Sequence, residues 1–103
     1  MYIGCHLSVS AGYAAAVDTA RSIGANTFAF FTRNPRGSRA KALDPADAAA
    51  LMALLAENRF APIIAHAPYT LNACALDEGL RASARDAMRE DVMTLDTYLP
   101  HML

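Results

Sequence analysis

His66 is the residue in this sequence whose type and position best suit metal binding. It follows the apolar, strand-like run of residues 62–65 and precedes Ala67, Pro68 and Tyr69. A neutral imidazole at the end of a strand is a common metal ligand. A histidine in this position can also serve only to hydrogen-bond its own loop. From the residues alone, both interpretations stay open.

Three further side chains lie at or after the ends of strand-like runs. The ring of Tyr69 can stack on a sugar or base or wedge into a nucleic-acid groove, and it can equally cap the core. Asn72 can hydrogen-bond a ligand, although loop asparagines more often bond their own backbone. His6 can support a metal ligand or face a phosphate, and a packed structural role is at least as common. Each of the three therefore has a binding and a structural interpretation.

Positive charge gathers in the loop of residues 33–41, which also contains Asn34. No acidic residue occurs from 19 to 43. Four of the nine basic residues of the chain lie in this loop: Arg33, Arg36, Arg39 and Lys41. Arginine binds phosphate through two parallel hydrogen bonds and also enters minor grooves. A solvated charged loop is the alternative. The whole chain has a net charge of −1, which argues against a surface coated with positive charge for non-specific nucleic-acid binding, whereas a local cationic loop can serve one anionic ligand.

Three strands alternating with three helices would position these residues. Apolar and β-branched runs predict strands at residues 2–7, 26–32 and 62–65, and helical spacing of apolar residues predicts a first helix at 13–23. The predicted boundary residues are Gly24 after the first helix, Asp44 and Pro45 opening the second, and Asp77 capping the third, which Pro100 ends. Residues 101–103 would approach a further strand.

This alternation implies an α/β fold with parallel strands. The loops of residues 6–12, 32–41 and 66–72 would then follow the carboxyl ends of the strands and share one edge of the sheet. A closed (β/α)8 TIM barrel needs about 250 residues. A chain of 103 residues is therefore expected to form about three βα units of a partial barrel, or a very small open α/β domain.

Composition limits the class of protein. The chain is 54% hydrophobic and 18% charged, which predicts a folded core. Its start lacks the pattern of a signal peptide, and its apolar runs are too short for a membrane span. Cys5 and Cys74 form no CxxC pair, which indicates reduced thiols and a cytoplasmic location. There is no phosphate-binding glycine loop and no G-x-S-x-G elbow to suggest another chemistry.

Three segments resemble the endonuclease IV family of apurinic/apyrimidinic endonucleases. Residues 2–12 (YIGCHLSVSAG) resemble its opening segment, and residues 28–36 (FAFFTRNPR) resemble its second strand and the loop that follows. Residues 66–72 (HAPYTLN) resemble its H-x-x-Y-x-x-N segment. The three segments occur in the family's order and at matching spacing, and they cover nearly the whole chain, so together they are specific.

The resemblance implies a zinc-dependent DNA repair enzyme on a TIM barrel. Members hydrolyse the phosphodiester 5′ to an abasic site in double-stranded DNA, in base excision repair. By this resemblance His66 matches a ligand of the family's three-zinc cluster. Arg36 matches the arginine that is inserted into DNA at the lesion, and Tyr69 matches the tyrosine that is inserted with it. Arg33 and Asn34 would belong to the same DNA-binding loop. His6 and Asn72 are expected to support the site without binding metal themselves.

The departures from the family pattern shape the expectation for this chain. Residues 1–103 are expected to be the N-terminal portion of the barrel, truncated before the fourth strand, with His66 as at most one of the zinc ligands. Such a chain is expected to be inactive alone and marginally stable. Thr70 also stands where members often carry a larger apolar residue. The alternatives are a xylose-isomerase-like sugar-metabolising barrel and a non-catalytic α/β module. The sequence predicts no oligomeric state.

Overall fold

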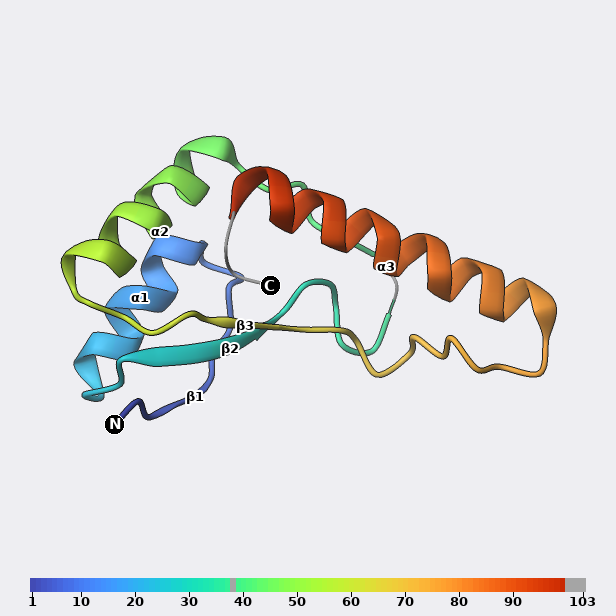
Figure 1. Cartoon of the computed structure of the whole chain (residues 1–103), viewed down its shortest axis with the longest axis horizontal. Helices are drawn as coiled ribbons and strands as arrows, with labels where there is room; N and C mark the ends of the chain where they lie inside the picture. Colours follow the sequence, from blue (N-terminus) through green and yellow to red (C-terminus); the bar gives the residue numbers. More distant parts are fainter. Residues whose placement is uncertain (38, 100–103) are drawn as a thin grey trace.

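The computed structural model describes residues 1–37 and 39–99, and this part of the chain alternates strands with helices (Figure 1). The order of elements is β1 (Gly4–His6), α1 (Tyr13–Ser22), β2 (Thr27–Phe31), α2 (Pro45–Glu57), β3 (Ile64–His66) and α3 (Glu78–Tyr98). The predicted α/β alternation is therefore confirmed. The predicted helix stop at Pro100 and the predicted strand approach at 101–103 lie outside the described residues, as does Ser38.

The helix boundaries follow the capping residues of the sequence. The side chain of Asp44 accepts a hydrogen bond from the amide of Ala46, and Pro45 opens α2. The side chain of Asp77 accepts one from the amide of Leu80 at the start of α3. After α1, Gly24 adopts a φ of 76°, the left-handed conformation that a glycine C-cap supplies. These three predictions are confirmed.

The strands form one parallel sheet in the order β1-β2-β3. They are shorter than the sequence predicts at residues 2–7 and 26–32, and β3 is displaced to 64–66, so that His66 is the last residue of the strand. Gly4 explains the close approach of β1 to β2, because a Cβ atom there would overlap the carbonyl oxygen of Thr27. A side chain at this position would separate the two strands.

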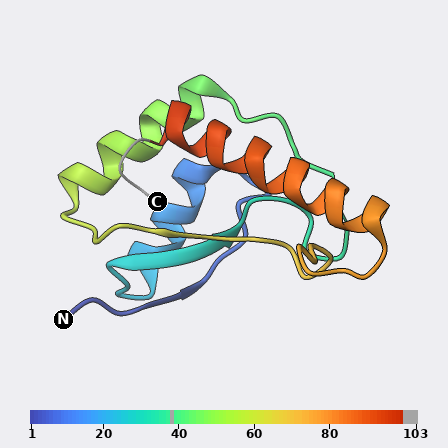
Figure 2. The same cartoon turned by 45° about the vertical axis from the view of Figure 1, so that its right-hand side comes forward.

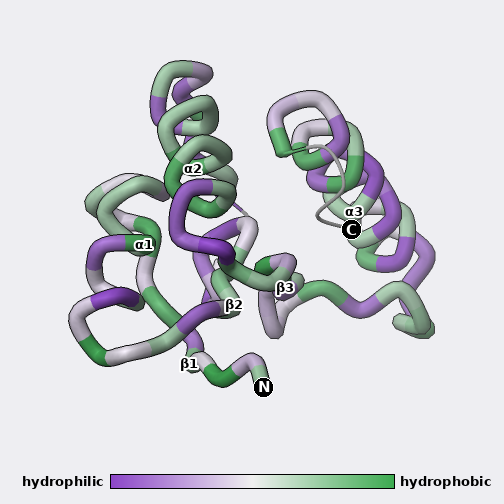
Figure 3. Tube along the Cα trace, turned by 60° about the vertical axis from the view of Figure 1, so that its left-hand side comes forward, coloured by the Kyte–Doolittle hydropathy of each residue, from purple (hydrophilic) through white to green (hydrophobic). Residues whose placement is uncertain are grey.

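All three helices cover the same face of the sheet, as Figures 1 and 2 show. Phe28 and Phe30 of β2 point toward the helices and are buried with Val17 of α1 and Leu51 of α2. In Figure 3 the tube of α2 is mostly hydrophobic, whereas that of α3 mixes hydrophilic and hydrophobic segments. The opposite face carries no helix in the described part of the chain. This face carries the side chains of Ala29 and Phe31 of β2 and of their partners in the neighbouring strands. His6 is the partner of Ala29, and His66 is the partner of Phe31.

Helix α3 is less completely buried than α1 and α2. Ala84, Ala87 and Leu95 are buried, whereas Leu80 and Val92 stay at least half exposed. None of the helices in the described part of the chain combines the length with the apolar character that a membrane crossing requires. Cys5 and Cys74 are both exposed free thiols.

Candidate functional site

The aromatic rings at the carboxyl ends of the strands form one cluster, centred on Phe31. The ring centroid of Phe31 lies 4.3 Å from that of His6, 4.8 Å from that of His66 and 5.2 Å from that of Tyr69. Parallel register accounts for this, because Phe31 pairs with His66 in the sheet and His6 pairs with Ala29. The prediction that loops distant in sequence share one edge of the sheet is confirmed.

His66 presents one ring nitrogen away from its own backbone. Its Nδ1 lies 2.5 Å from the carbonyl oxygen of Ala67. Since a carbonyl oxygen can only accept, Nδ1 carries the proton in this contact, which leaves Nε2 as the nitrogen that can bind a metal when the ring is neutral. Histidine ligands commonly have their second nitrogen fixed in this way. The residue is exposed, so the geometry suits Nε2 as one metal ligand.

The side chains of residues 1–37 and 39–99 do not make a complete zinc site. A structural or catalytic zinc ion takes at least three protein ligands. Residues 1–37 and 39–99 contain no group of three or more His, Cys, Asp or Glu side chains that could hold a metal ion. Among the described residues His6 is the other imidazole at this edge, and the ring centroids of His6 and His66 lie 6.0 Å apart. The described residues therefore contribute His66 as a single well-oriented ligand.

Arg33 does not lie on the loop surface where the sequence predicted it to meet DNA. Only 6% of its side chain is exposed, and its Nε donates to Asp91 Oδ1 at 2.8 Å. Its Nη2 donates to Glu90 Oε2 at 2.7 Å and to the carbonyl oxygen of Ala87 at 3.3 Å. Asp91 also accepts from the hydroxyl of Thr32, at 2.6 Å. Arg33 thus holds the start of the basic loop against α3, which supplies the acidic partners that the loop itself lacks.

The charge of Arg33 is secured by these contacts. Burial alone would lower the pKa of Arg33, but the hydrogen bonds and charges of Glu90 and Asp91 outweigh it and raise that pKa above its usual value. The guanidinium therefore stays charged, and its charge is paired with the carboxylates of Glu90 and Asp91 on α3.

Asn34 and Arg36 form a tight turn immediately after Arg33. The Oδ1 of Asn34 accepts from the amide of Arg36 at 3.0 Å, and the carbonyl oxygen of Asn34 accepts from the amide of Gly37 at 3.1 Å. Asn34 therefore shapes the backbone of the turn. Arg36 is exposed, as a residue that contacts a macromolecule must be.

The loop after β3 lies against this turn. The amide of Tyr69 donates to the carbonyl oxygen of Pro35 at 3.1 Å, and the hydroxyl of Thr70 donates to the carbonyl oxygen of Gly37 at 2.9 Å. Tyr69 itself is 74% exposed. The Oδ1 of Asn72 accepts from the amide of Cys74, which is the backbone-bonding role left open in the sequence.

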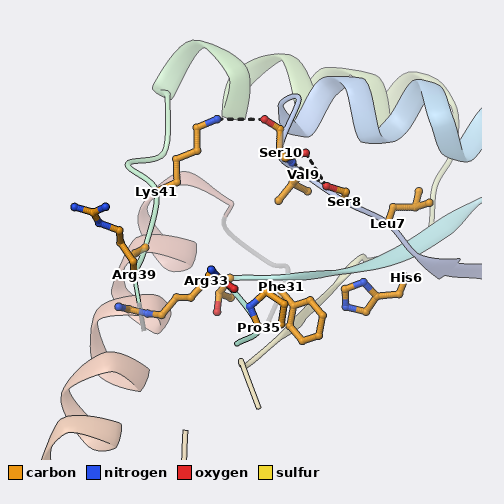
Figure 4. A pocket seen from close by; sticks show the side chains of 13 residues that line it. His6, Leu7, Ser8, Val9, Ser10, Phe31, Arg33, Pro35, Arg39 and Lys41 are labelled. Carbon is orange, nitrogen blue, oxygen red and sulfur yellow. Dashed lines mark hydrogen bonds between the residues drawn. The ribbon is translucent and has the colours of Figure 1, made fainter. Parts of the chain in front are cut away.

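A cavity of about 710 Å³ lies between the basic loop and the loop after β1 (Figure 4). Figure 4 shows Lys41 reaching the backbone of the first loop, where its Nζ donates to the carbonyl oxygen of Ser10 at 3.4 Å. The hydroxyls of Ser8 and Ser10 lie 2.8 Å apart on the same wall. The sequence did not single out these serines. The available signal was their place in the loop after β1, on the predicted functional edge.

Asp47 fixes the loop after β1 from outside the cavity. Its carboxylate accepts from the amides of Tyr13 at 2.6 Å and Ala14 at 3.1 Å, and so caps α1 from α2. Gly12, at the N-cap of α1, has no side chain to do this. Burial, and then the charges of Asp47 and Asp91, raise the pKa of the Tyr13 phenol.

Comparisons with known proteins agree on one group of enzymes. A family model described as a xylose isomerase-like TIM barrel matches residues 17–95. The "Probable endonuclease 4" of Alkaliphilus oremlandii is 56% identical over 99 residues, covering 96% of this chain and 35% of that protein. The protein of the same name from Akkermansia muciniphila is 52% identical over 99 residues, with the same coverage of each chain.

A solved structure supports the same grouping. The crystal structure of endonuclease IV from Thermus thermophilus superposes with a TM-score of 0.81 at 33% identity, over 89% of this chain and 35% of that chain. The three strands and their helices match part of the endonuclease IV barrel. The chain spans about a third of the length of the curated relatives that it matches.

Proposed function

This chain belongs to the endonuclease IV family, and on that premise we propose that it serves the zinc-dependent hydrolysis of the phosphodiester 5′ to abasic sites in double-stranded DNA. One observation carries the proposal. The exposed imidazole of His66 and the exposed ring of Tyr69 lie at the same sheet edge as the turn that presents Arg36. A metal ligand and two DNA-contacting side chains are thereby within reach of one lesion.

The proposed roles are divided among few residues. His66 would provide one zinc ligand through Nε2, and Arg36 and Tyr69 would contact the duplex at the lesion. Asn34 would hold the turn, with His6 and Asn72 supporting the same edge. We leave Arg33 out of the DNA-contacting set because its guanidinium is bound to α3.

A catalytic zinc site needs more protein ligands than the described residues offer. With a complete ligand set, zinc would activate water and neutralise charge on the phosphate. Because the described residues offer one oriented ligand, we propose that the chain is inactive alone. The free thiols of Cys5 and Cys74 suit the cytoplasmic location that we propose with this function.

Binding to a duplex that contains one tetrahydrofuran abasic analogue tests the DNA-binding part. We expect the chain to prefer this duplex to an undamaged one, and Arg36→Ala to weaken its binding about tenfold, the value of one charged contact. Arg21→Ala is the matched control, because it removes the same charge from an exposed pair with Asp18 at the far end of α1. Equal effects of the two variants, or none, would favour the sugar-metabolising barrel.

Proton NMR of the histidine rings during a zinc titration tests the metal-binding part. We expect the ring signals of His66 to shift at lower zinc concentrations than those of His6, and His66→Ala to remove the first step. Binding should be weak, since a tight site needs more ligands. A titration that His66→Ala leaves unchanged would favour the non-catalytic α/β module.

A further inference from the structure

Two hydrogen bonds between the loops after β2 and β3 lie on either side of Arg36. The amide of Tyr69 donates to the carbonyl oxygen of Pro35, the residue before Arg36. The hydroxyl of Thr70 donates to the carbonyl oxygen of Gly37, the residue after it. Two consecutive residues of one loop thus hold both peptide neighbours of the arginine. We call this pair of hydrogen bonds the Tyr69–Thr70 clamp.

The rest of the turn is fixed at its first residue. Arg33 is bound to α3 through Glu90 and Asp91, and Asn34 closes the turn through the amides of Arg36 and Gly37. With the clamp added, the backbone at Arg36 is held from the α3 side and from the β3 side. Its side chain nevertheless stays exposed.

We propose that Thr70 is a positioning residue, whose hydroxyl holds the Arg36 turn beside Tyr69 so that both side chains meet DNA as one pre-ordered unit. The inference rests on the function proposed above. Ordering a loop during binding costs affinity, and a loop already held in place avoids that cost. Thr70 would therefore raise DNA affinity without touching DNA itself.

The side chain of Thr70 is suited to an exchange that removes only its hydrogen bond. Thr70→Val keeps the branched shape and removes the donor, and Thr70→Ser keeps the donor and removes a methyl group. Thr70 is exposed, so neither variant disturbs the core. We expect Thr70→Val to weaken binding of the abasic duplex about three- to tenfold, mainly through faster dissociation, and Thr70→Ser to stay within about twofold of the unchanged chain.

A double-mutant cycle separates positioning from a general structural role. If Thr70 acts by positioning Arg36, Thr70→Val should weaken DNA binding clearly less in an Arg36→Ala background than in the unsubstituted chain. Amide 15N relaxation, measured on the chain without DNA, gives a second readout. Thr70→Val should increase motion at the amides of Arg36 and Gly37, and Thr70→Ser should not.

The outcomes are distinct. Additive effects in the cycle, or a valine variant with unchanged affinity and unchanged relaxation, would overturn the positioning role. Failure of the unsubstituted chain to prefer the abasic duplex would count against the proposed function instead. The relaxation of the valine and serine variants would then decide by itself whether Thr70 orders the turn.

Discussion

Asp91→Ala should destabilise the fold far more than Glu90→Ala, although both remove one carboxylate from neighbouring positions of α3. The side chain of Asp91 is 13% exposed and binds both Arg33 and Thr32. The side chain of Glu90 is 67% exposed, and among the described residues it binds Arg33 alone. The two variants therefore differ in burial and in the number of groups left without an acceptor.

The expected magnitudes follow from these differences. Removing one partner of a buried ion pair costs about 3–5 kcal/mol. Glu90 and the carbonyl oxygen of Ala87 remain on the guanidinium and reduce that figure, whereas loss of the Thr32 hydrogen bond adds about 1 kcal/mol. We expect a net loss of about 2–4 kcal/mol for Asp91→Ala. An exposed pair contributes about 0–1 kcal/mol, which sets the loss for Glu90→Ala.

Urea unfolding at pH 7, followed by circular dichroism, measures both losses. For a domain whose whole stability is of the order of 5–15 kcal/mol, the Asp91 variant should have a visibly lower midpoint at an unchanged m-value. The pKa of Arg33 is raised in the folded state. The contribution of Arg33 to stability is therefore fully present below the ordinary arginine pKa, and it is lost only as the pH rises through the raised pKa. Repeating the comparison at pH 9 should thus give the same difference. Equal losses for the two variants, or a loss below about 1 kcal/mol for Asp91→Ala, would refute the argument.

Three further predictions concern the loop after β1 and the glycines. Asp47→Ala should lower the free energy of unfolding by about 1–2 kcal/mol in urea, because α1 loses its only side-chain cap in the described structure, and an unchanged midpoint would contradict this. The raised pKa of Tyr13 stabilises the fold below the ordinary tyrosine pKa of about 10, and this contribution is lost as pH rises through the raised value. Tyr13→Phe should then reduce the fall in unfolding free energy between about pH 9 and 11, and parallel pH profiles would speak against burial of the phenol. Gly4→Ala should lower the free energy of unfolding by about 3 kcal/mol or more in thermal unfolding, because the new Cβ would overlap the carbonyl oxygen of Thr27. Gly24→Ala should lower it by about 1–2 kcal/mol, because only its φ of 76° is unfavourable for alanine. The reverse order would be inconsistent with the parallel pairing of β1 and β2.

The features that the sequence predicted correctly depend on local rules. Asp44, Asp77 and Gly24 act within one turn of their own helices, so residue type and position sufficed. The common edge of the loops followed from topology, because alternating strands and helices give a parallel sheet whose strand ends meet. That rule brought His66 and Tyr69 to the Arg36 turn although about thirty residues separate them in sequence.

The features that the sequence did not predict depend on distant partners. Arg33 and Asp91 are 58 residues apart, and nothing in the basic loop indicates which of its arginines α3 will bind. Asp47 has the position of an ordinary first-turn acid in α2, yet it binds amides 33 and 34 residues away in α1. The lengths of the first two strands were overestimated from the sequence for a related reason. Apolar residues beyond the paired segment have the composition of a strand, although no neighbouring strand pairs with them.

The basic loop illustrates why charge counting alone misassigns such residues. Arg33 and Arg36 are three positions apart with the same charge, but one is buried against α3 and the other is exposed beyond the Asn34 turn. Burial of the first fixes the backbone from which the second projects, so the two arginines have complementary roles rather than the same one. In a loop of four equivalent solvated cations none of the side chains would be held in place. Ordering such a loop on binding DNA would cost conformational entropy and would lower the affinity. The acidic residues of α3 and the hydroxyl of Thr70 therefore belong to the proposed DNA-binding site as fully as Arg36 does, although neither would contact the duplex.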